Sequence, residues 1–280
     1  MRRRFLKPNQ HTFTFLLNAC TKENSKLTPG VQVHDHVIKL GYTHHVFVRN
    51  ALIHFYFECS DAKECSKKVF DEDIDGICSD VVTWNSMLAG LVRKGEVFVA
   101  EKMFDEMPER DVVSWSTMIM GYVQNGNLED GLECFRLMRE KGIRPNEAIL
   151  VTVLSASANL GLLEFGRFVH STVESLRFRI TVLIGTALVD MYAKCGCIEE
   201  SRALFDRMLE KDIWTWNVMI CGLASHDRPK EAIALFHEFI REGFSPVNVT
   251  FVGVLNACSR AGLVRLRITE AGYSPNMSPV

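Results

Sequence analysis

The hydrophobic positions of residues 81–111 form two helical stripes with a break between them. The first stripe has the i, i+3, i+4, i+7 spacing of one helix face and consists of Trp84, Met87, Leu88 and Leu91. The second stripe has the same spacing and consists of Ala100, Met103, Phe104 and Met107. Gly95 suits the end of the first helix because glycine tolerates positive φ, and Pro108 closes the second helix. The segment therefore predicts a hairpin of two antiparallel helices.

The same pattern recurs along the chain. Trp115 and Trp216 open matching stripes in residues 112–146 and 213–247. Aligned on these features, the chain divides into repeats at 10–45, 46–80, 81–111, 112–146, 147–181, 182–212 and 213–247, with a partial repeat at 248–264. We expect residues 1–9 to be the end of a missing preceding repeat and residues 265–280 to be an irregular C-terminal tail. The acidic residues 71–80 are expected to form a loop.

One helical hairpin cannot bury both of its faces, but stacked neighbours can. An internal period in the thirties therefore predicts an all-α fold, a right-handed α-solenoid superhelix of antiparallel helix-turn-helix repeats. The Trp residues at the start of the stripes could serve as stacking platforms for bases. Their place within the apolar stripes favours the core instead.

The composition sets limits on this interpretation. The chain has 47% hydrophobic and 24% charged residues, which is enough to bury a core, and a net charge of -2. This charge gives no overall attraction to nucleic acid, so an RNA-binding protein of this composition needs a local basic stripe. The nine Cys residues form no CxxC pair, which indicates a reduced compartment. No apolar run reaches the roughly 18–20 residues of a membrane span.

No catalytic or metal-binding motif stands out. Residues 237–241 read HEFIR and not HExxH, and His34, Asp35 and His36 have no further ligands at metal-binding spacing. A glycine-rich phosphate loop and the zinc deaminase signature are also missing. We therefore expect no catalytic residue, no metal and no cofactor, and we expect that the chain is not an enzyme.

At this point the residues resemble a known family. The motifs VTWN (82–85), ALVDMYAKCG (187–196), EKGIRPN (140–146) and FVGVLNACSRAGLV (251–264) are similar to those of plant pentatricopeptide repeat proteins. The alternation of 31- and 35-residue repeats resembles the subfamily with mixed P, L and S motifs, here in a truncated form without the C-terminal E/DYW domains. The resemblance covers residues 8–264. It implies sequence-selective binding of single-stranded RNA, one base per repeat, in organellar RNA editing or processing.

The resemblance implies that the fifth and last residues of a repeat read the base. The pairs are Asn50 with Asp80, Asn85 with Asp111, Ser116 with Asn146, and Thr186 with Asp212. By the pairing rules of the family, repeats 46–80 to 182–212 then read U-U-A-any-G. Asn217 has Val247 as its last residue, which leaves a weak pyrimidine bias, and repeats 10–45 (Thr14, His45) and 147–181 (Val151, Thr181) are unread. The residues themselves support one such position, because Asn85 follows Trp84 and so points about 100° away from the apolar stripe.

Two further columns follow from the resemblance. The second residues, which wedge between bases in the family, are Phe47, Val82, Val113, Leu183 and Trp214. The thirteenth residues, at the ends of the first helices, include Lys22, Arg93, Lys194 and Arg260. These four could form the basic stripe that contacts phosphates, or they could only complement the helix C-termini.

The expected partners are single-stranded organellar RNA and editing or processing factors supplied in trans, and the chain is expected to be a monomer that contacts no membrane. The expected location is a mitochondrion or chloroplast; the acid-free start MRRR suits a transit peptide, although the first repeat already begins at residue 10. Two other functions stay open. One is a protein-binding helical-repeat scaffold, and the other is a truncated product that has lost its function.

Overall fold

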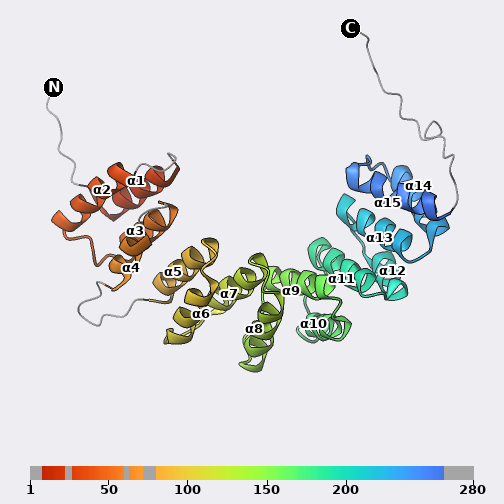
Figure 1. Ribbon diagram of the computed structural model, residues 1–280, viewed down its shortest axis with the longest axis horizontal. Coiled ribbons are helices and arrows are strands. Elements are labelled where there is room, and N and C mark those ends of the chain that lie inside the picture. The colour runs from red at the N-terminus through yellow and green to blue at the C-terminus, as the bar shows by residue number, and fades with distance from the viewer. Residues whose placement is uncertain (1–7, 23–26, 60–62, 72–79, 262–280) are drawn as a thin grey trace, which may run out of the picture. The chain divides into compact units, whose positions relative to one another are not determined.

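The computed structural model describes residues 8–22, 27–59, 63–71 and 80–261 (Figure 1). The side chains of Lys22, Leu27, Lys63, Glu64 and Asp71 lie outside this description. Within these residues the chain folds into fifteen α-helices and no strand. The expected acidic loop lies almost entirely outside the described residues, as does the expected C-terminal tail.

The odd-numbered helices are the first helices of the repeats. They are α1 (Gln10–Lys22), α3 (Val46–Glu58), α5 (Val81–Arg93), α7 (Val112–Gln124), α9 (Glu147–Leu160), α11 (Val182–Lys194), α13 (Ile213–Ser225) and α15 (Asn248–Arg260). Each begins at the residue that opens a repeat in the sequence alignment. The second helices are α2 (Leu27–Lys39), α4 (Lys63–Asp71), α6 (Val97–Glu106), α8 (Leu128–Glu140), α10 (Leu163–Ser175), α12 (Ile198–Arg207) and α14 (Pro229–Arg241).

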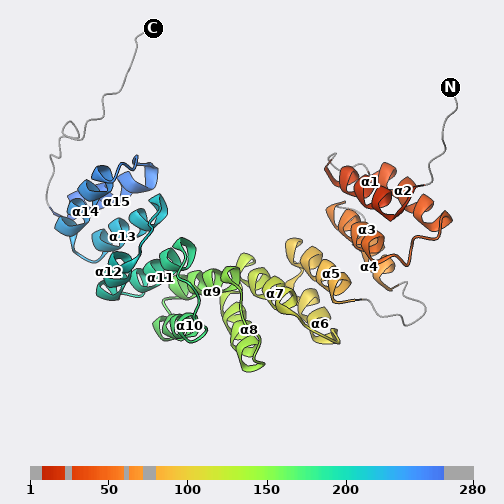
Figure 2. The same ribbon diagram turned by 180° about the vertical axis from the view of Figure 1, so that it is seen from behind.

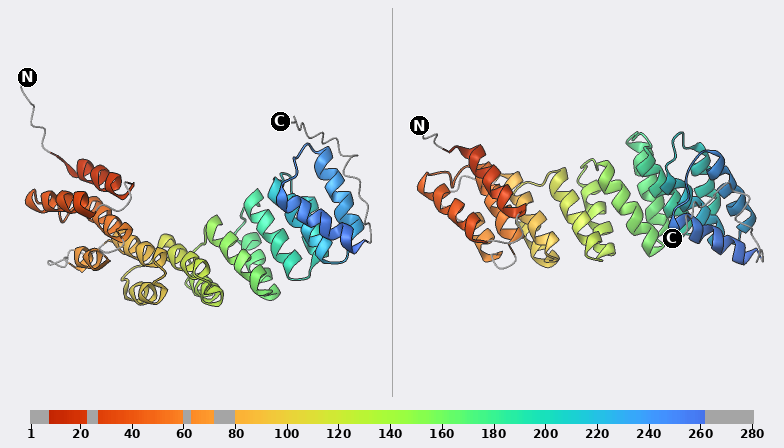
Figure 3. Two further views of the ribbon diagram at one scale, coloured as in Figure 1. Left: turned by 45° about the horizontal axis from the view of Figure 1, so that its top comes forward. Right: turned by 90° about the horizontal axis from the view of Figure 1, so that it is seen from above.

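The chain forms two compact halves, Met1–Asn146 and Glu147–Val280. In the N-terminal half, α1, α3, α5 and α7 contact one another in sequence order, and each packs against its own second helix (Figures 1 and 2). In the C-terminal half, α9, α11, α13 and α15 also contact one another in sequence order. There, α9, α11 and α13 each pack against their own second helix, and α15 packs against α14, the second helix of the preceding repeat (Figure 3). Within each half the fold is therefore a stack of helical hairpins.

Trp115 and Trp216 belong to the core that joins consecutive hairpins. Trp115 and Trp216 are buried, and each packs edge-on against a Phe from the second helix of the preceding repeat. The ring centroids are 4.9 Å apart for Trp115 and Phe104 and 5.0 Å apart for Trp216 and Phe205. Such edge-to-face aromatic pairs stabilise a fold beyond the area that they bury. These two Trp side chains are thus occupied in packing.

Three of the first helices approach their predecessors at a glycine, the tenth residue of the repeat. A Cβ added to Gly90 would lie 2.3 Å from the ring of Phe57, and one added to Gly121 would lie 2.6 Å from Val92. At Gly222 the nearest atom, the Cβ of Ala193, would be 3.1 Å away. The missing side chain therefore sets how closely consecutive first helices pack.

Candidate functional site

The last residue of several repeats is the N-cap of the next first helix. The carboxylates of Asp80, Asp111 and Asp212 accept hydrogen bonds from the backbone N–H groups of Thr83, Ser114 and Thr215, at 2.9, 2.9 and 2.8 Å. The hydroxyl groups of these three residues donate to the same carboxylates. An N-cap satisfies a helix N–H that has no partner within the helix. Each of these carboxylates is therefore held in a fixed position by the helix that follows it.

The fifth and last residues of repeat 81–111 meet directly. Asn85 Nδ2 donates to Asp111 Oδ1 at 3.1 Å. Burial alone raises the pKa of Asp111, but hydrogen bonds from the Ser114 N–H, the Asn85 amide and the Ser114 hydroxyl outweigh it and hold the pKa below its ordinary value. The carboxylate is therefore charged at neutral pH and can only accept hydrogen bonds. The Asn85 amide therefore faces the carboxylate with its Nδ2 donor and not with its Oδ1 acceptor.

In the C-terminal half, two fifth residues contact the third residue of the next repeat. Thr186 and Thr215 share a hydrogen bond of 2.7 Å between their hydroxyl groups. Asn217 Oδ1 accepts from Thr250 Oγ1 at 2.6 Å, and Thr250 in turn accepts from the Val247 N–H at 3.1 Å. The group that positions a fifth residue thus belongs to the start of the following repeat.

The predicted reading residues differ in exposure. Asn85 is 8% exposed and Asn217 is 1% exposed, whereas Asn50, Ser116 and Thr186 are half-buried and Asn146 is exposed. Three of the amides keep a solvent-shielded atom without a hydrogen-bond partner, namely Asn50 Oδ1, Asn85 Oδ1 and Asn217 Nδ2. Ser116 has only a weak 4.0 Å contact with Met120 Sδ among its described hydrogen bonds. Whether these residues read bases stays a prediction.

All five predicted wedge residues project into solvent. Their exposed fractions lie between 55% and 66%, although all five are apolar, as follows: Phe47, Val82, Val113, Leu183 and Trp214. Each is the second residue of its helix, three positions before the fifth residue. In each half the structure therefore places exposed apolar side chains one helical turn from the predicted reading residues.

The basic thirteenth residues are engaged with the preceding repeat. Arg93 forms a 2.6 Å ion pair with Glu58, Lys194 bonds to Asn159 at 3.4 Å, and Arg260 bonds to the Ser225 carbonyl at 3.2 Å. Glu58, Asn159 and Ser225 are themselves thirteenth residues. Lys194 and Arg260 also pair with Asp190 at 2.8 Å and Asp227 at 2.7 Å. The side chain of Lys22 lies outside the described residues.

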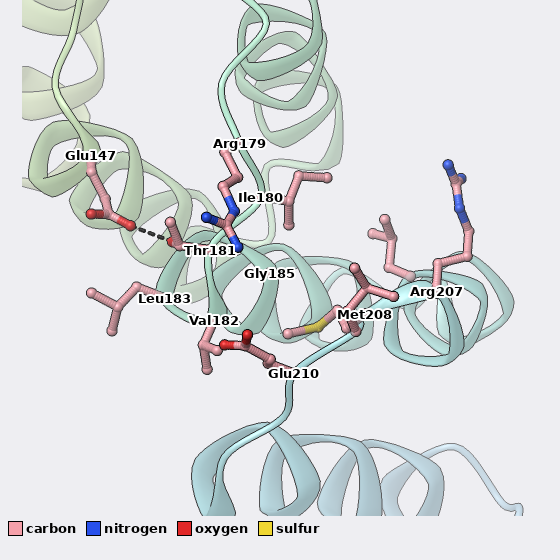
Figure 4. A pocket seen from close by; sticks show the side chains of 12 residues that line it. Glu147, Arg179, Ile180, Thr181, Val182, Leu183, Gly185, Arg207, Met208 and Glu210 are labelled. Carbon is pink, nitrogen blue, oxygen red and sulfur yellow. Dashed lines mark hydrogen bonds between the residues drawn. The ribbon is translucent and has the colours of Figure 1, made fainter.

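Two hollows are lined in part by predicted wedge residues. In the N-terminal half a hollow of about 460 Å³ is lined by fifth residues Thr14 and Asn50, the wedge residue Phe47, and His54. In the C-terminal half a hollow of about 660 Å³ lies where α11 begins and α12 ends (Figure 4). Arg179, Leu183 and Met208 line it, and the Thr181 hydroxyl donates to Glu147 beside it (Figure 4).

Within the described ranges, no group of three or more His, Cys, Asp or Glu side chains is arranged to hold a metal ion. The helices in that same part of the chain are all too short or too polar to cross a membrane.

Comparison with known proteins decides the family. Models described as PPR repeat match residues 75–108, 113–143 and 186–213, and a model described as PPR repeat family matches residues 211–260. The chain belongs to the pentatricopeptide repeat family. Two solved structures of the pentatricopeptide repeat protein PPR10 share its fold at 19% identity. The structure of the maize protein matches with a TM-score of 0.55 and covers 94% of this chain and 48% of that chain. The complex of PPR10 with an 18-nt psaJ RNA element matches with a TM-score of 0.57 and covers 96% of this chain and 45% of that chain. The all-α fold of stacked helical hairpins is thus confirmed.

Similar proteins of Arabidopsis thaliana carry the same repeats. Two pentatricopeptide repeat-containing proteins are 38% and 41% identical over 93% and 86% of this chain. A third, named chloroplastic, is 40% identical over 92% of this chain. The chain spans 42%, 41% and 56% of the lengths of these three relatives.

Sequence reasoning missed two sets of residues in these pentatricopeptide repeats. Thr215 and Thr250 position fifth residues of the preceding repeats, and Glu58 neutralises a basic thirteenth residue. A signal for the first set was present, because a Ser or Thr stands three residues after Asp80, Asp111, Asp212 and Val247. This spacing is that of a side chain returning to an N-cap.

Proposed function

We propose that the chain binds single-stranded RNA, and that each repeat whose fifth and last residues form a reading pair of the family contacts one base. The observation that carries this proposal is the contact between Asn85 and Asp111, because it joins the two positions that read bases in the family. The family match and the RNA complex of PPR10 support the class of ligand. One base per repeat is the mode of recognition of such arrays.

The chemistry of Asn85 matches uracil. Since the Asp111 carboxylate takes the Nδ2 end of the amide, Oδ1 is left as an acceptor without a partner. The Watson–Crick edge of uracil presents an N3–H donor, whereas the N3 atom of cytosine is an acceptor. Asn85 Oδ1 should therefore prefer uracil, which has a donor at N3, over cytosine. This agrees with the uridine that the Asn–Asp pair implies.

The wedge residues supply the affinity that does not depend on sequence. An apolar side chain that is exposed in the free protein can be covered by the face of a base, and stacking on an aromatic side chain stabilises binding by about 1–3 kcal/mol per base. Phe47 and Trp214 have aromatic rings, with exposed fractions of 66% and 59%. We expect Val82, Val113 and Leu183 to contribute less per base.

The proposed RNA element reads U-U-A-any-G from repeat 46–80 to repeat 182–212. Its source would be an organellar transcript, and any editing or processing reaction would be performed by factors supplied in trans. The relative that is named chloroplastic supports an organelle as the location.

The test exchanges one reading residue. Asn85→Thr creates the Thr–Asp pair that implies guanine, so preference at one nucleotide should move from U to G while the other positions keep theirs. RNA selected from a randomised pool by both proteins measures this. Ser86→Ala, at the adjacent residue whose hydroxyl donates to the Val82 carbonyl, is the matched control and should select the same RNA as the parent.

Two results would contradict the proposal. An unchanged preference in Asn85→Thr would overturn the reading role of Asn85. No enrichment of any RNA by the parent protein would overturn RNA binding itself and would favour a protein-binding scaffold or an inactive fragment.

A further inference from the structure

Asn85 and Asn217 occupy the same position in their repeats but lack a partner at opposite ends of the amide. Asn85 has an unpaired Oδ1, and Asn217 has an unpaired Nδ2. The difference originates in the last residue of each repeat, which is Asp111 in one case and Val247 in the other. A valine side chain offers no acceptor, so the amide of Asn217 has to find its orienting group elsewhere.

Thr250 provides this group from the next repeat. Its Oγ1 accepts the Val247 N–H at 3.1 Å, which leaves its hydroxyl hydrogen to donate to Asn217 Oδ1 at 2.6 Å. Thr250 is fully buried at 0% exposure, so no water competes for this hydroxyl. The Oδ1 end of the amide is therefore occupied, and the Nδ2 end is the one left over.

The orientation of Asn217 has a consequence for base choice. An Nδ2 group is a donor only, so it pairs with the acceptor N3 of cytosine and meets the N3–H of uracil donor against donor. We propose that Thr250 is a positioning residue for base recognition, and that it makes Asn217 select cytosine where Asn85 selects uracil. This inference rests on the proposed function. It extends the expected RNA element to U-U-A-any-G-C.

The burial of Asn217 strengthens the selection. The side chain is 1% exposed and its Nδ2 group is already removed from water without a compensating hydrogen bond. A buried donor without a partner is unfavourable, so a base that reaches it restores a hydrogen bond with no further loss of solvation of that group. The side chains that cover Asn217 have to shift for this contact, since its Nδ2 group is shielded in the RNA-free protein.

The experiment measures binding of the full chain to synthetic RNAs that carry U-U-A-N-G followed by C, U, A or G. The parent should prefer C over U at the last nucleotide by roughly threefold to tenfold, the range expected for one hydrogen bond. Thr250→Val removes the hydroxyl at nearly constant volume and should abolish this preference while the U preference at Asn85 persists. Thr250→Ser keeps the hydroxyl and should retain the preference for C over U.

A second variant tests the same idea through a gain of selectivity. Val247→Asp recreates the last residue of repeat 81–111, so the carboxylate should take Nδ2, free Oδ1, and shift the preference from C to U. It also introduces a favourable N-cap for α15, so loss of folding is not expected. Thermal unfolding of each variant shows that the proteins compared are folded.

The outcomes separate this inference from the proposed function. If the parent binds the RNAs but prefers U or shows no preference at the last nucleotide, or if Thr250→Val and Val247→Asp keep the parent preference for C, the role of Thr250 is wrong and RNA binding stands. If the parent binds none of the RNAs, the proposed function fails first.

Discussion

At the scale of single residues, contacts across repeats change what a charge can do. Arg93 is one of the candidates for a phosphate contact, and its guanidinium lies 2.6 Å from Glu58, one repeat earlier. Both side chains are about half exposed, so this ion pair itself contributes little stability. Its effect is on the local field, because a cation that is paired with a carboxylate attracts a phosphate less than a free one does.

Removing the carboxylate should therefore increase RNA binding. In Glu58→Gln, Arg93 loses its counter-charge and becomes free to contact a phosphate. We expect a higher affinity at low salt and a slope of log K against log salt that is steeper by about 0.7, the value for one additional phosphate contact on a single strand. Fluorescence anisotropy with a labelled RNA over a salt series measures both.

Glu164→Gln is the matched control, since Glu164 forms an exposed 3.0 Å ion pair with Arg167 within one helix of the other half. It removes the same charge from a residue outside the thirteenth column. An equal increase in both variants would show that net charge alone is responsible, and no change in Glu58→Gln would show that Arg93 does not contact the RNA.

The columns of residues could be predicted from the sequence, but their environments could not. The repeat boundaries locate the second, fifth and thirteenth residues once the family resemblance has singled out these positions. The burial of Asn217 to 1% exposure and the pairing of Arg93 with Glu58 depend on how consecutive first helices pack. A pattern on one helix describes its own faces, and it does not tell which side chain of the next repeat will lie against them.

At the scale of helices, a glycine decides how closely two repeats pack. Gly90 lies on α5 against the ring of Phe57 from α3, and Phe57 is buried at 2% exposure. Alanine is the better helix former by about 1 kcal/mol. The choice of glycine at this position is therefore a packing requirement, because the ring occupies the space that a Cβ would need.

Gly90→Ala should destabilise the protein. The added methyl group would lie 2.3 Å from a ring that the core holds in place, and overpacking of this kind costs about 1–3 kcal/mol, more than the gain in helix propensity. Urea unfolding followed by circular dichroism measures the change. Gly222→Ala, where the nearest contact is 3.1 Å, is the matched control and should be close to neutral. Equal stability of both variants would contradict this account of the packing.

At the scale of the whole chain, two half-buried histidines couple folding to pH. Burial lowers the pKa of His54, as does the nearby Arg93, while Glu58 opposes the shift. Burial also lowers the pKa of His170, whose Nδ1 lies 2.9 Å from the Tyr192 hydroxyl, with Glu174 raising it and Arg207 lowering it. Both imidazoles are therefore more easily protonated in the unfolded chain than in the folded protein.

The sign of the pH dependence follows from linkage. As the pH falls through about 6.5, the unfolded chain takes up protons before the folded protein does, so the free energy of unfolding decreases. The melting temperature should thus be lower at pH 5.5 than at pH 7.5. His170→Gln should reduce this difference. A melting temperature that rises on acidification over this range would contradict the assignment.

The fold itself was largely readable from the chain. Apolar stripes at helical spacing, with a break at residues such as Gly95, predict the helices and where the first helix of each repeat begins. The segment 72–79 marks the limit of this approach, because its acidic sequence has no stripe to align. Periodicity locates an element only where one of its faces has to be buried.

The contact between Asn217 and Thr250 also determines how such an array can be recombined. A segment cut at residues 213–247 would carry the amide that we propose reads a base but leave behind the Thr250 hydroxyl that is hydrogen-bonded to it. In a new host, the same asparagine would then take its preference from whichever residue happened to open the adjoining segment. A transplanted segment that keeps Asn217 together with its orienting hydroxyl therefore has to extend to Thr250, the third residue of the following repeat.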